Sequence, residues 1–415
     1  MKRRAMVAGT AALDMIPQFP ASACRRDEIL MEGKTVYLPD IQLILGGCVS
    51  NTGIAMHRLG AEVILCSKVG GDPLAGVVRQ MLEESGAEVR LAELKGHATS
   101  ATVVVAPEGS DRSFWHRRGA SQVYALSDIP ADAAESSPPG PTTPASGSPP
   151  TPADAAERCD LFHFGYPTGM ACMYGDGGVT LADLYGGIKR MGLTTSMDLS
   201  LPGLTSESAR ADWKTILRRV LPCVDVFLPS LEELLLLLHR PYYMEVLQRA
   251  GADCAVRYAD LSILPALADE VLAMGPKVFG VKLGEKGLYL RTAKKEAFAS
   301  FGRMSGALSP RWYDRELMEL PYRPERFRSA NGAGDTAIAG FLAGMMDGCG
   351  PEDCLRLAAG AAACRIETGH QGIPSAREVL ERARAGWEKL GAAPEGGWAE
   401  TAEGLYASPR DSLQG

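Results

Sequence analysis

Short hydrophobic runs alternate with helix-like patterns along most of this 415-residue chain. Residues 5–10 form an apolar run that ends in a glycine turn, which predicts a buried strand. Further strands are predicted at 63–67, 161–164, 195–199, 224–228, 278–283 and 287–290, and helices near 51–59, 74–85, 179–191, 206–220, 231–239 and 335–346. This alternation is typical of parallel strands joined by crossover helices, so it predicts a large α/β domain.

A second group of segments alternates between hydrophobic and polar residues, as short half-buried strands do. Within residues 25–45 the apolar positions are Ile29, Met31, Val36, Leu38, Ile41, Leu43 and Leu45. The strand candidates 101–106 and 113–116 flank residues 107–110, whose sequence PEGS favours a hairpin turn. We therefore expect a small separate sheet built from residues 29–45 and 99–118.

The remaining segments define the expected domain organisation. Residues 130–157 are dense in Pro, Ser, Thr, Ala and Gly and lack apolar periodicity, which predicts a flexible surface insertion. Residues 302–328 look irregular. The expected main domain comprises residues 1–28, 46–98 and 119–390, and residues 391–415 are expected to form a C-terminal tail.

Composition and charge narrow the possible partners. The net charge of −7 and the pI near 5.6 argue against a nucleic-acid binder or an anionic-membrane binder, since both require a basic surface. No stretch approaches the roughly 20 apolar residues of a membrane span. Ten cysteines without paired CxxC spacing are interpreted as reduced core residues. We therefore expect a cytoplasmic protein with a small-molecule substrate.

The loop Asn331-Gly332-Ala333-Gly334-Asp335 precedes an apolar helix and is the sharpest chemical feature. Its small residues let backbone N–H groups approach an anion, and the helix N-terminus adds positive partial charge. A first-turn carboxylate can accept the proton of a hydroxyl group, as phosphoryl transfer to an alcohol requires. Taken alone, the loop is more typical of an ordinary helix N-cap. It also fits a dinucleotide fingerprint, but residues 326–330 are a poor strand for that motif.

A second loop contains Gly46, Gly47 and Asn51. Paired glycines let the backbone lie close to a ligand, and the Asn51 amide can both donate to and accept from sugar hydroxyls. The same loop in isolation could equally be a strand-to-helix turn with an asparagine cap.

Four motifs in this order resemble the ribokinase-like, or PfkB, carbohydrate kinases over about residues 5–385. They are Gly46-Gly47 with Asn51, residues 68–73 (KVGGDP), residues 281–287 (VKLGEKG) and residues 332–335 (GAGD). The resemblance implies a three-layer α/β/α domain with a mostly parallel central sheet and a small β-sheet lid. It also implies an ATP-dependent kinase that phosphorylates a hydroxyl of a sugar or sugar-like molecule.

The resemblance assigns roles to individual residues. Gly332, Ala333 and Gly334 would form the anion hole, and Asp335 would be the general base. The substrate would be bound by Asp14, Gly46, Gly47 and Asn51, and the nucleotide by Lys282, Gly284 and Gly287. On the residues alone, Asp14 could instead be a solvated turn carboxylate and Lys282 a solvated lysine at a strand end. Closure of the lid would exclude water and limit wasteful ATP hydrolysis.

The implied cofactors are ATP and Mg²⁺. Ser230-Leu231-Glu232-Glu233 stands where the family has Asn-x-x-Glu, so Glu233 is the candidate to contact Mg²⁺ through water. A magnesium ion held largely by phosphates and water needs few protein ligands. Ser329-Ala330 replaces the family's Asp-Thr pair, which makes activation by a monovalent cation doubtful.

Several alternatives remain open at this stage. A sugar, a sugar acid and a nucleoside all fit as the acceptor, and a non-catalytic sugar- or nucleotide-sensing protein on the same scaffold is a separate alternative. The basic residues 116–118 could reach an acidic substrate or could simply be solvated. Asp198 ends a predicted strand near the expected active edge, whereas His163 is predicted to be a core histidine. A homodimer could form through the lid sheet.

Overall fold

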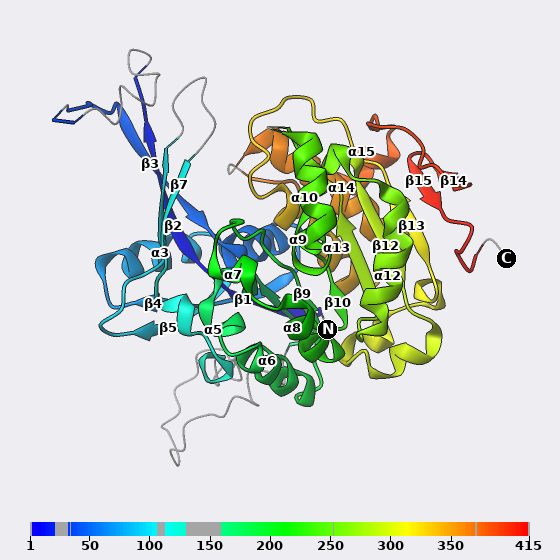
Figure 1. Ribbon diagram of the computed structural model, residues 1–415, viewed down its shortest axis with the longest axis horizontal. Coiled ribbons are helices and arrows are strands. Elements are labelled where there is room, and N and C mark those ends of the chain that lie inside the picture. The colour runs from blue at the N-terminus through cyan, green and yellow to red at the C-terminus, as the bar shows by residue number, and fades with distance from the viewer. Residues whose placement is uncertain are drawn as a thin grey trace, which may run out of the picture.

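The computed structural model describes residues 2–20, 32–33, 35–105, 113–129, 159–251, 253–369 and 372–413. Its main body is an 11-stranded sheet covered by helices on both faces, and a four-stranded sheet projects from one end (Figure 1). The predicted fold class is therefore confirmed. The insertion at 130–157, the hairpin turn at 107–110 and the strand candidates around Ile29 and Met31 lie outside the described residues.

The strands of the main sheet are arranged in the order β14-β15-β13-β12-β11-β10-β9-β8-β1-β4-β5. Their bounds are β1 (Arg4–Gly9), β4 (Glu62–Gly70), β5 (Glu88–Leu94), β8 (Leu161–Gly165), β9 (Thr194–Met197), β10 (Val226–Phe227), β11 (Val278–Lys282), β12 (Leu288–Thr292), β13 (Glu316–Glu319), β14 (Ala399–Ala402) and β15 (Leu405–Ala407). Every pair from β5 to β11 is parallel, and every pair from β11 to β14 is antiparallel.

Strand β1 lies where the strand order reverses. The chain passes from β1 to β4 and β5 on one side of the sheet and returns to β8 on the other side. In open α/β sheets, ligands bind at such a switch point, in the crevice beyond the carboxyl ends of the strands. The residues that follow Gly9 and Gly165 therefore lie at the edge of the sheet where a ligand is expected to bind.

The apolar residues of β1 serve both faces of the sheet. Met6 and Ala8 belong to one buried cluster, whereas Ala5 and Val7 belong to the other, as the two-residue period of a strand requires. A strand buried on both faces gives a continuous hydrophobic run rather than an alternating one. That is why the first strand could be recognised from the sequence.

Helices on the two faces pack against these two clusters. The first face carries α5 (Ala171–Tyr174), α6 (Val179–Arg190), α8 (Trp213–Val220), α9 (Leu231–Leu238), α10 (Arg240–Ala250), α11 (Ala255–Tyr258) and α12 (Leu264–Ala273), and the short helix α7 (Glu207–Arg210) precedes α8. The second face carries a π-helical turn, η1 (Val49–Ile54), followed by α2 (Ala55–Arg58), α3 (Pro73–Glu83), α13 (Ala333–Met346), α14 (Pro351–Thr368) and α15 (Ala376–Arg384). None of the helices in the described ranges is long and apolar enough to cross a membrane.

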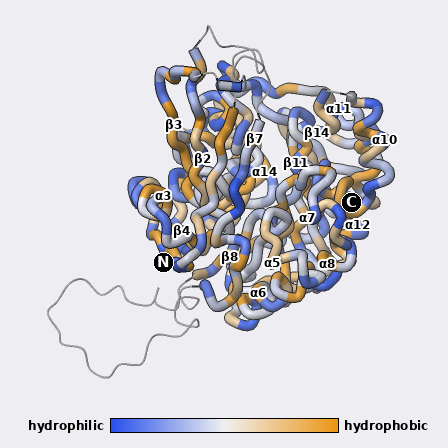
Figure 2. Tube along the Cα trace, turned by 60° about the vertical axis from the view of Figure 1, so that its left-hand side comes forward, coloured by the Kyte–Doolittle hydropathy of each residue, from blue (hydrophilic) through white to orange (hydrophobic). Residues whose placement is uncertain are grey.

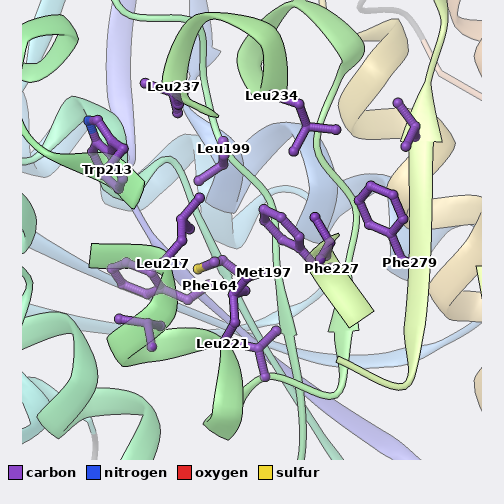
Figure 3. Close-up of a cluster of buried hydrophobic side chains, with 14 of the residues drawn as sticks. Phe164, Met197, Leu199, Trp213, Leu217, Leu221, Phe227, Leu234, Leu237 and Phe279 are labelled. Atoms are coloured by element: carbon purple, nitrogen blue, oxygen red, sulfur yellow. The ribbon is translucent and has the colours of Figure 1, made fainter. Parts of the chain in front are cut away.

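Figure 3 shows how the first cluster is filled. Side chains of Trp213 and Leu217 from α8, and of Leu234 and Leu237 from α9, lie over Phe164, Met197, Phe227 and Phe279 of the sheet. The leucine run 234–238 is thus a buried helix face.

The small sheet has the strand order β3-β2-β6-β7, and Figure 2 labels its strands β3, β2 and β7. Its strands are β2 (Ala12–Gln18), β3 (Asp40–Gly46), β6 (Ala101–Val105) and β7 (Ser113–Arg117). Two details differ from expectation. Residues 12–18 were placed in the main domain but form a central strand of this sheet, and Val36 and Leu38 lie outside any strand. Pro17 within β2 weakens the sequence signal of a central strand, since proline cannot donate a ladder hydrogen bond.

The C-terminal residues are part of the main sheet rather than a tail. Strand β15 pairs with β13, and Leu405, Tyr406 and Ala407 are buried. Strand β13 lies within the segment that was expected to be irregular. Its ends are Glu316 and Glu319, which are fully buried and would not be expected in a strand core. The Ser408 hydroxyl donates to Glu316 and the Lys389 ammonium pairs with Glu319, so these carboxylates are compensated by distant residues.

Candidate active site

The loop before α13 reaches the carboxyl ends of the central strands. Gly332 caps the helix with φ of +74°, and a Cβ there would lie 2.9 Å from the Arg365 guanidinium, so only glycine fits without strain. The first turn of a helix leaves backbone N–H groups that can bind an anion. The Ala333 N–H donates to the Ala330 carbonyl at 3.1 Å, so the candidate anion-binding amides are those of Gly332, Gly334 and Asp335.

Side chains from two other elements contact the carboxylate of Asp335, which is only 6% exposed. The Asn51 amide, from η1, donates to Oδ2 at 3.0 Å. The Tyr166 hydroxyl, from the loop after β8, lies 2.6 Å from Oδ1 and 2.7 Å from Oδ2. The structure thus brings together two predicted residues, Asn51 and Asp335, and adds Tyr166, which the sequence analysis missed.

The electrostatic surroundings of Asp335 act in opposite directions. Burial raises the pKa of its carboxyl group, while the Tyr166 hydroxyl and the positive charge of Lys282 lower it in part. The net pKa is above that of an ordinary aspartate. Lys282, at the end of β11, is largely buried, and its stem lies 3.6 Å from a Cβ position on Gly334. It is therefore not a solvated strand-end lysine but a cation beside the loop.

Asp198 follows β9 beneath this group and is completely buried. Lys282 Nζ lies 4.0 Å from its Oδ2, and His163 Nε2 lies 3.7 Å from its Oδ1. Burial raises the pKa of Asp198 well above its usual value, although Lys282 opposes this rise. His163 hydrogen-bonds Ser196 at 3.0 Å, and burial lowers its pKa to about 3, so it is a neutral core histidine.

The predicted substrate-binding residues lie where the small sheet joins the main body. Gly47 adopts φ of +89°, and a Cβ on Gly46 would lie 2.5 Å from the Asp14 carboxylate. Burial raises the pKa of Asp14, and the Thr102 hydroxyl partly opposes this effect. Thr102 in turn hydrogen-bonds His116 at 3.0 Å. A polar row therefore crosses β2, β6 and β7 beside the loop that carries Asn51.

The basic residues 116–118 do not form a common charged patch. The Arg117 guanidinium donates to Asp72 at 3.0 Å and to the Thr99 carbonyl at 2.9 Å. Because Asp72 also accepts from the Thr99 hydroxyl at 2.6 Å, the KVGGDP motif anchors the small sheet through this network. Arg117 thus has a structural role.

The segment predicted to bind the nucleotide forms the turn between β11 and β12. Gly284 and Gly287 flank it with φ of +58° and +92°. Glu233 lies near Lys282, which lowers its pKa, although burial raises it more strongly. Ser230 N–H donates to the Glu233 carboxylate at 2.7 Å, so the pair forms a reciprocal cap of α9.

The candidate protein ligand for magnesium is the Glu233 carboxylate, which fits an ion that is bound mostly by nucleotide phosphates and water. In the part of the chain that the structure describes, no three His, Cys, Asp or Glu side chains are arranged to hold a metal. Glu233 would contribute a single carboxylate, which is sufficient for that mode of binding. When bound, the ion would neutralise phosphate charge.

Two residues that sequence reasoning missed complete the site. Tyr166 directly follows a parallel strand, a position where functional loops are common, but no motif distinguishes it. Arg365 lies on α14, and its guanidinium donates to the Asn331 carbonyl at 3.1 Å. Nothing in the sequence relates Arg365 to a loop 34 positions earlier.

Comparisons of the sequence with known proteins found a family model and a relative that it resembles. A family model described as pfkB family carbohydrate kinase matches residues 19–137 and 204–376. Ribokinase of Bacillus subtilis (strain 168) is 27% identical over 131 residues. That match covers 31% of this chain and 42% of the relative, so the chain matches less than half of that protein's length.

Solved structures share the fold at low identity. The structure of Arabidopsis thaliana ribokinase complexed with ribose and ATP has a TM-score of 0.62 and 18% identity, and the match covers 92% of this chain and 98% of that one. Ribokinase from Giardia lamblia has a TM-score of 0.62 and 15% identity, covering 93% and 99%. Methanocaldococcus jannaschii nucleoside kinase has a TM-score of 0.57 and 17% identity, covering 92% and 98%.

The raised pKa of Asp198 predicts a specific pH dependence of stability. A carboxyl group whose folded pKa exceeds its unfolded value stabilises the fold below the unfolded pKa of about 3.9, and this stabilisation is lost as pH rises through the folded pKa. Asp198→Asn cannot ionise. The melting temperature of this variant minus that of the wild type should therefore increase between about pH 5 and pH 8.

The exposed Asp212 provides the control, because its pKa is lowered and it stays ionised across that range. Asp212→Asn should differ from the wild type by a constant amount at each pH in a thermal-unfolding series. A pH-independent difference for Asp198→Asn as well would mean that Asp198 is ionised in the folded protein.

Proposed function

The chain belongs to the pfkB family of carbohydrate kinases, and from this membership we propose that it transfers the γ-phosphoryl group of ATP to a hydroxyl of a sugar or sugar-like molecule. The observation that carries the proposal is the contact between Asn51 and Asp335 at the N-terminus of α13. It brings a group suited to binding hydroxyls next to a carboxylate suited to take their proton.

In the proposed reaction Asp335 is the general base. The acceptor hydroxyl gives its proton to the Asp335 carboxylate as its oxygen forms a bond to the γ-phosphorus. The bond from that phosphorus to the bridging oxygen breaks, and ADP leaves. The raised pKa of Asp335 makes it a better proton acceptor than an ordinary aspartate.

The other site residues position and stabilise. Asp14, Gly46, Gly47 and Asn51 would orient the acceptor, and holding it in line with the phosphoryl group supplies much of the rate. The amides of Gly332, Gly334 and Asp335, together with Lys282, would stabilise the charge of the transferring group. Gly284 and Gly287 would admit the nucleotide, and Glu233 would contact Mg²⁺ through water.

Two classes of acceptor, a sugar and a nucleoside, are supported. Ribose and ATP occur together in the Arabidopsis thaliana neighbour, which supports a sugar. The Methanocaldococcus jannaschii neighbour, a nucleoside kinase, supports a nucleoside as the second candidate. Asn51, Thr102 and His116 are neutral side chains that can hydrogen-bond hydroxyl groups, so they suit either acceptor. Arg117 is engaged within the fold, which disfavours an acceptor recognised by a cluster of charges.

Asp335→Asn tests the base directly. Because Asn keeps the shape of the side chain but cannot accept a proton, kcat should fall by about 10²- to 10⁴-fold while nucleotide affinity persists. ADP release across sugars, sugar acids and nucleosides measures turnover, and ligand-induced thermal stabilisation measures binding. Asp347→Asn, at the exposed C-terminal end of the same helix, is the matched control.

Substantial turnover in Asp335→Asn would contradict this role. Ligand-induced stabilisation of the wild type without any ADP release would instead identify the chain as a sensor of sugars or nucleotides.

We also propose that turnover does not require a monovalent cation. Ser329 and Ala330 offer no carboxylate before the anion loop, and the Arg365 guanidinium already places a fixed positive charge on the Asn331 carbonyl. Potassium chloride and tetramethylammonium chloride screen charges equally at one ionic strength, so kcat in the two salts should agree within about twofold. A strong rise of kcat with potassium alone would refute this proposal.

A homodimer through the small sheet is proposed from its outer face. The cross-strand row Leu43, Met15, Val103 and Trp115 lies on the face opposite Asp14, and its end residues Leu43 and Trp115 are 44% and 52% exposed. Exposed apolar rows of this kind mark association surfaces. Trp115→Ser should convert a dimer to a monomer in sedimentation velocity, whereas Tyr258→Ser, on α11, should not. A monomeric wild type would contradict the proposal.

A further inference from the structure

Tyr166 has an unusual backbone conformation for an aromatic residue. Its φ is +63°, in the left-handed region, and in the described ranges only one other non-glycine residue, Asp314, has a positive φ. Bulky residues rarely adopt this conformation, and such outliers concentrate at functional sites. The loop is held in place by the Thr168 hydroxyl, which donates to the Ser200 carbonyl at 2.6 Å. The fold thus maintains a strained backbone that directs one phenol at Asp335.

The Tyr166 hydroxyl contacts both oxygens of the proposed base. It lies 2.6 Å from Oδ1 and 2.7 Å from Oδ2 of Asp335, while Asn51 donates to Oδ2. Since Asp335 is only 6% exposed, little of the carboxylate surface is left for another donor. A hydroxyl that gives its proton to Asp335 would then have to take the place of one of these donors, and the phenol is the one that contacts both oxygens.

We propose that Tyr166 is a positioning residue that caps Asp335. Its hydroxyl is displaced from Asp335 only by an acceptor hydroxyl, so Asp335 does not take a proton from water and ATP is not hydrolysed. This inference rests on the proposed kinase function and deepens it. An acceptor held by several contacts can displace the phenol, whereas a single water molecule has no comparable binding contacts to offset the lost bonds.

The reaction that the cap suppresses is the hydrolysis of ATP, in which the same bonds form and break with water in place of the acceptor. A water molecule would give a proton to Asp335 and form an oxygen–phosphorus bond, and the bond to the bridging oxygen would break to release ADP and inorganic phosphate. The phenol cannot replace water as nucleophile in this way, because burial keeps the pKa of Tyr166 well above its usual value. It stays protonated and acts as a donor.

Charged and titratable groups from every neighbouring element face Asp335. They are Lys282 from β11, Asp198 after β9, Glu233 from α9, Arg365 from α14 and Cys48 before η1. All of them stay in place in Tyr166→Phe, which loses only the phenol oxygen. Because the lost hydrogen bond favours the ionised carboxylate, the pKa of Asp335 should rise further, and the acidic limb of kcat/KM should move to higher pH.

The test compares the wild type with Tyr166→Phe, using ADP release with ATP alone and with ATP plus the best acceptor found in the panel. Tyr185→Phe is the matched control, since its hydroxyl is also buried but donates to the Ser196 carbonyl at 2.9 Å. Without acceptor, Tyr166→Phe should release ADP about tenfold faster than the wild type or more, since a positioned base contributes at least that much to proton transfer. Its acceptor-dependent turnover should persist, with the acidic limb shifted upward.

The outcomes separate the inference from the function on which it rests. A wild type with acceptor-dependent turnover, together with a Tyr166→Phe variant whose acceptor-free ADP release and pH profile are unchanged, would refute the capping role alone. An equal increase of acceptor-free ADP release in Tyr185→Phe would also refute it, because the effect would then come from general loosening of the core. A wild type that releases no ADP with any acceptor would overturn the proposed function and the cap together.

Discussion

The hydrogen bond between Asn51 and Asp335 joins two loops that are 284 positions apart in the sequence. Asn51 follows the small sheet and Asp335 lies in the first turn of α13, so this contact connects the proposed acceptor side of the site to its proposed anion-binding side. It forms beside β1, the strand at which the order of the sheet reverses. The position of that strand therefore determines where the chemistry can occur.

Burial determines how the site behaves electrostatically. Asp335 and Asp198 are carboxyl groups removed from water, which raises the pKa of both, and Lys282 partly compensates each of them. In a low-dielectric setting a charge interacts strongly with its neighbours, so a single phenol or ammonium group has a large influence. The same burial that raises the pKa of Asp335 also increases the influence of its few hydrogen bonds on that pKa.

The sequence predicted those parts of the molecule whose signal is local. A few neighbouring residues are enough to indicate the structure of these parts. They are the hydrophobic runs of β1 and β8, helix α13, and the glycine loops at 46–47 and 332–334. Strand β13 was missed because Glu316 and Glu319 are charged, and their compensation by Ser408 and Lys389 depends on contacts across the sheet. Tyr166 was missed for a similar reason, since its importance arises from a backbone conformation and a partner 169 positions away.

The proposed role of Asp335 as the base is tested most directly by a crystal structure of the wild type. The crystal would contain a nonhydrolysable ATP analogue and an acceptor that the enzyme is known to phosphorylate. One acceptor hydroxyl is expected to lie about 2.6–3.2 Å from the Asp335 carboxylate, where the Tyr166 phenol would otherwise lie, and to face the γ-phosphorus. An acceptor hydroxyl that faces the γ-phosphorus without contacting Asp335 would contradict the assignment of the base.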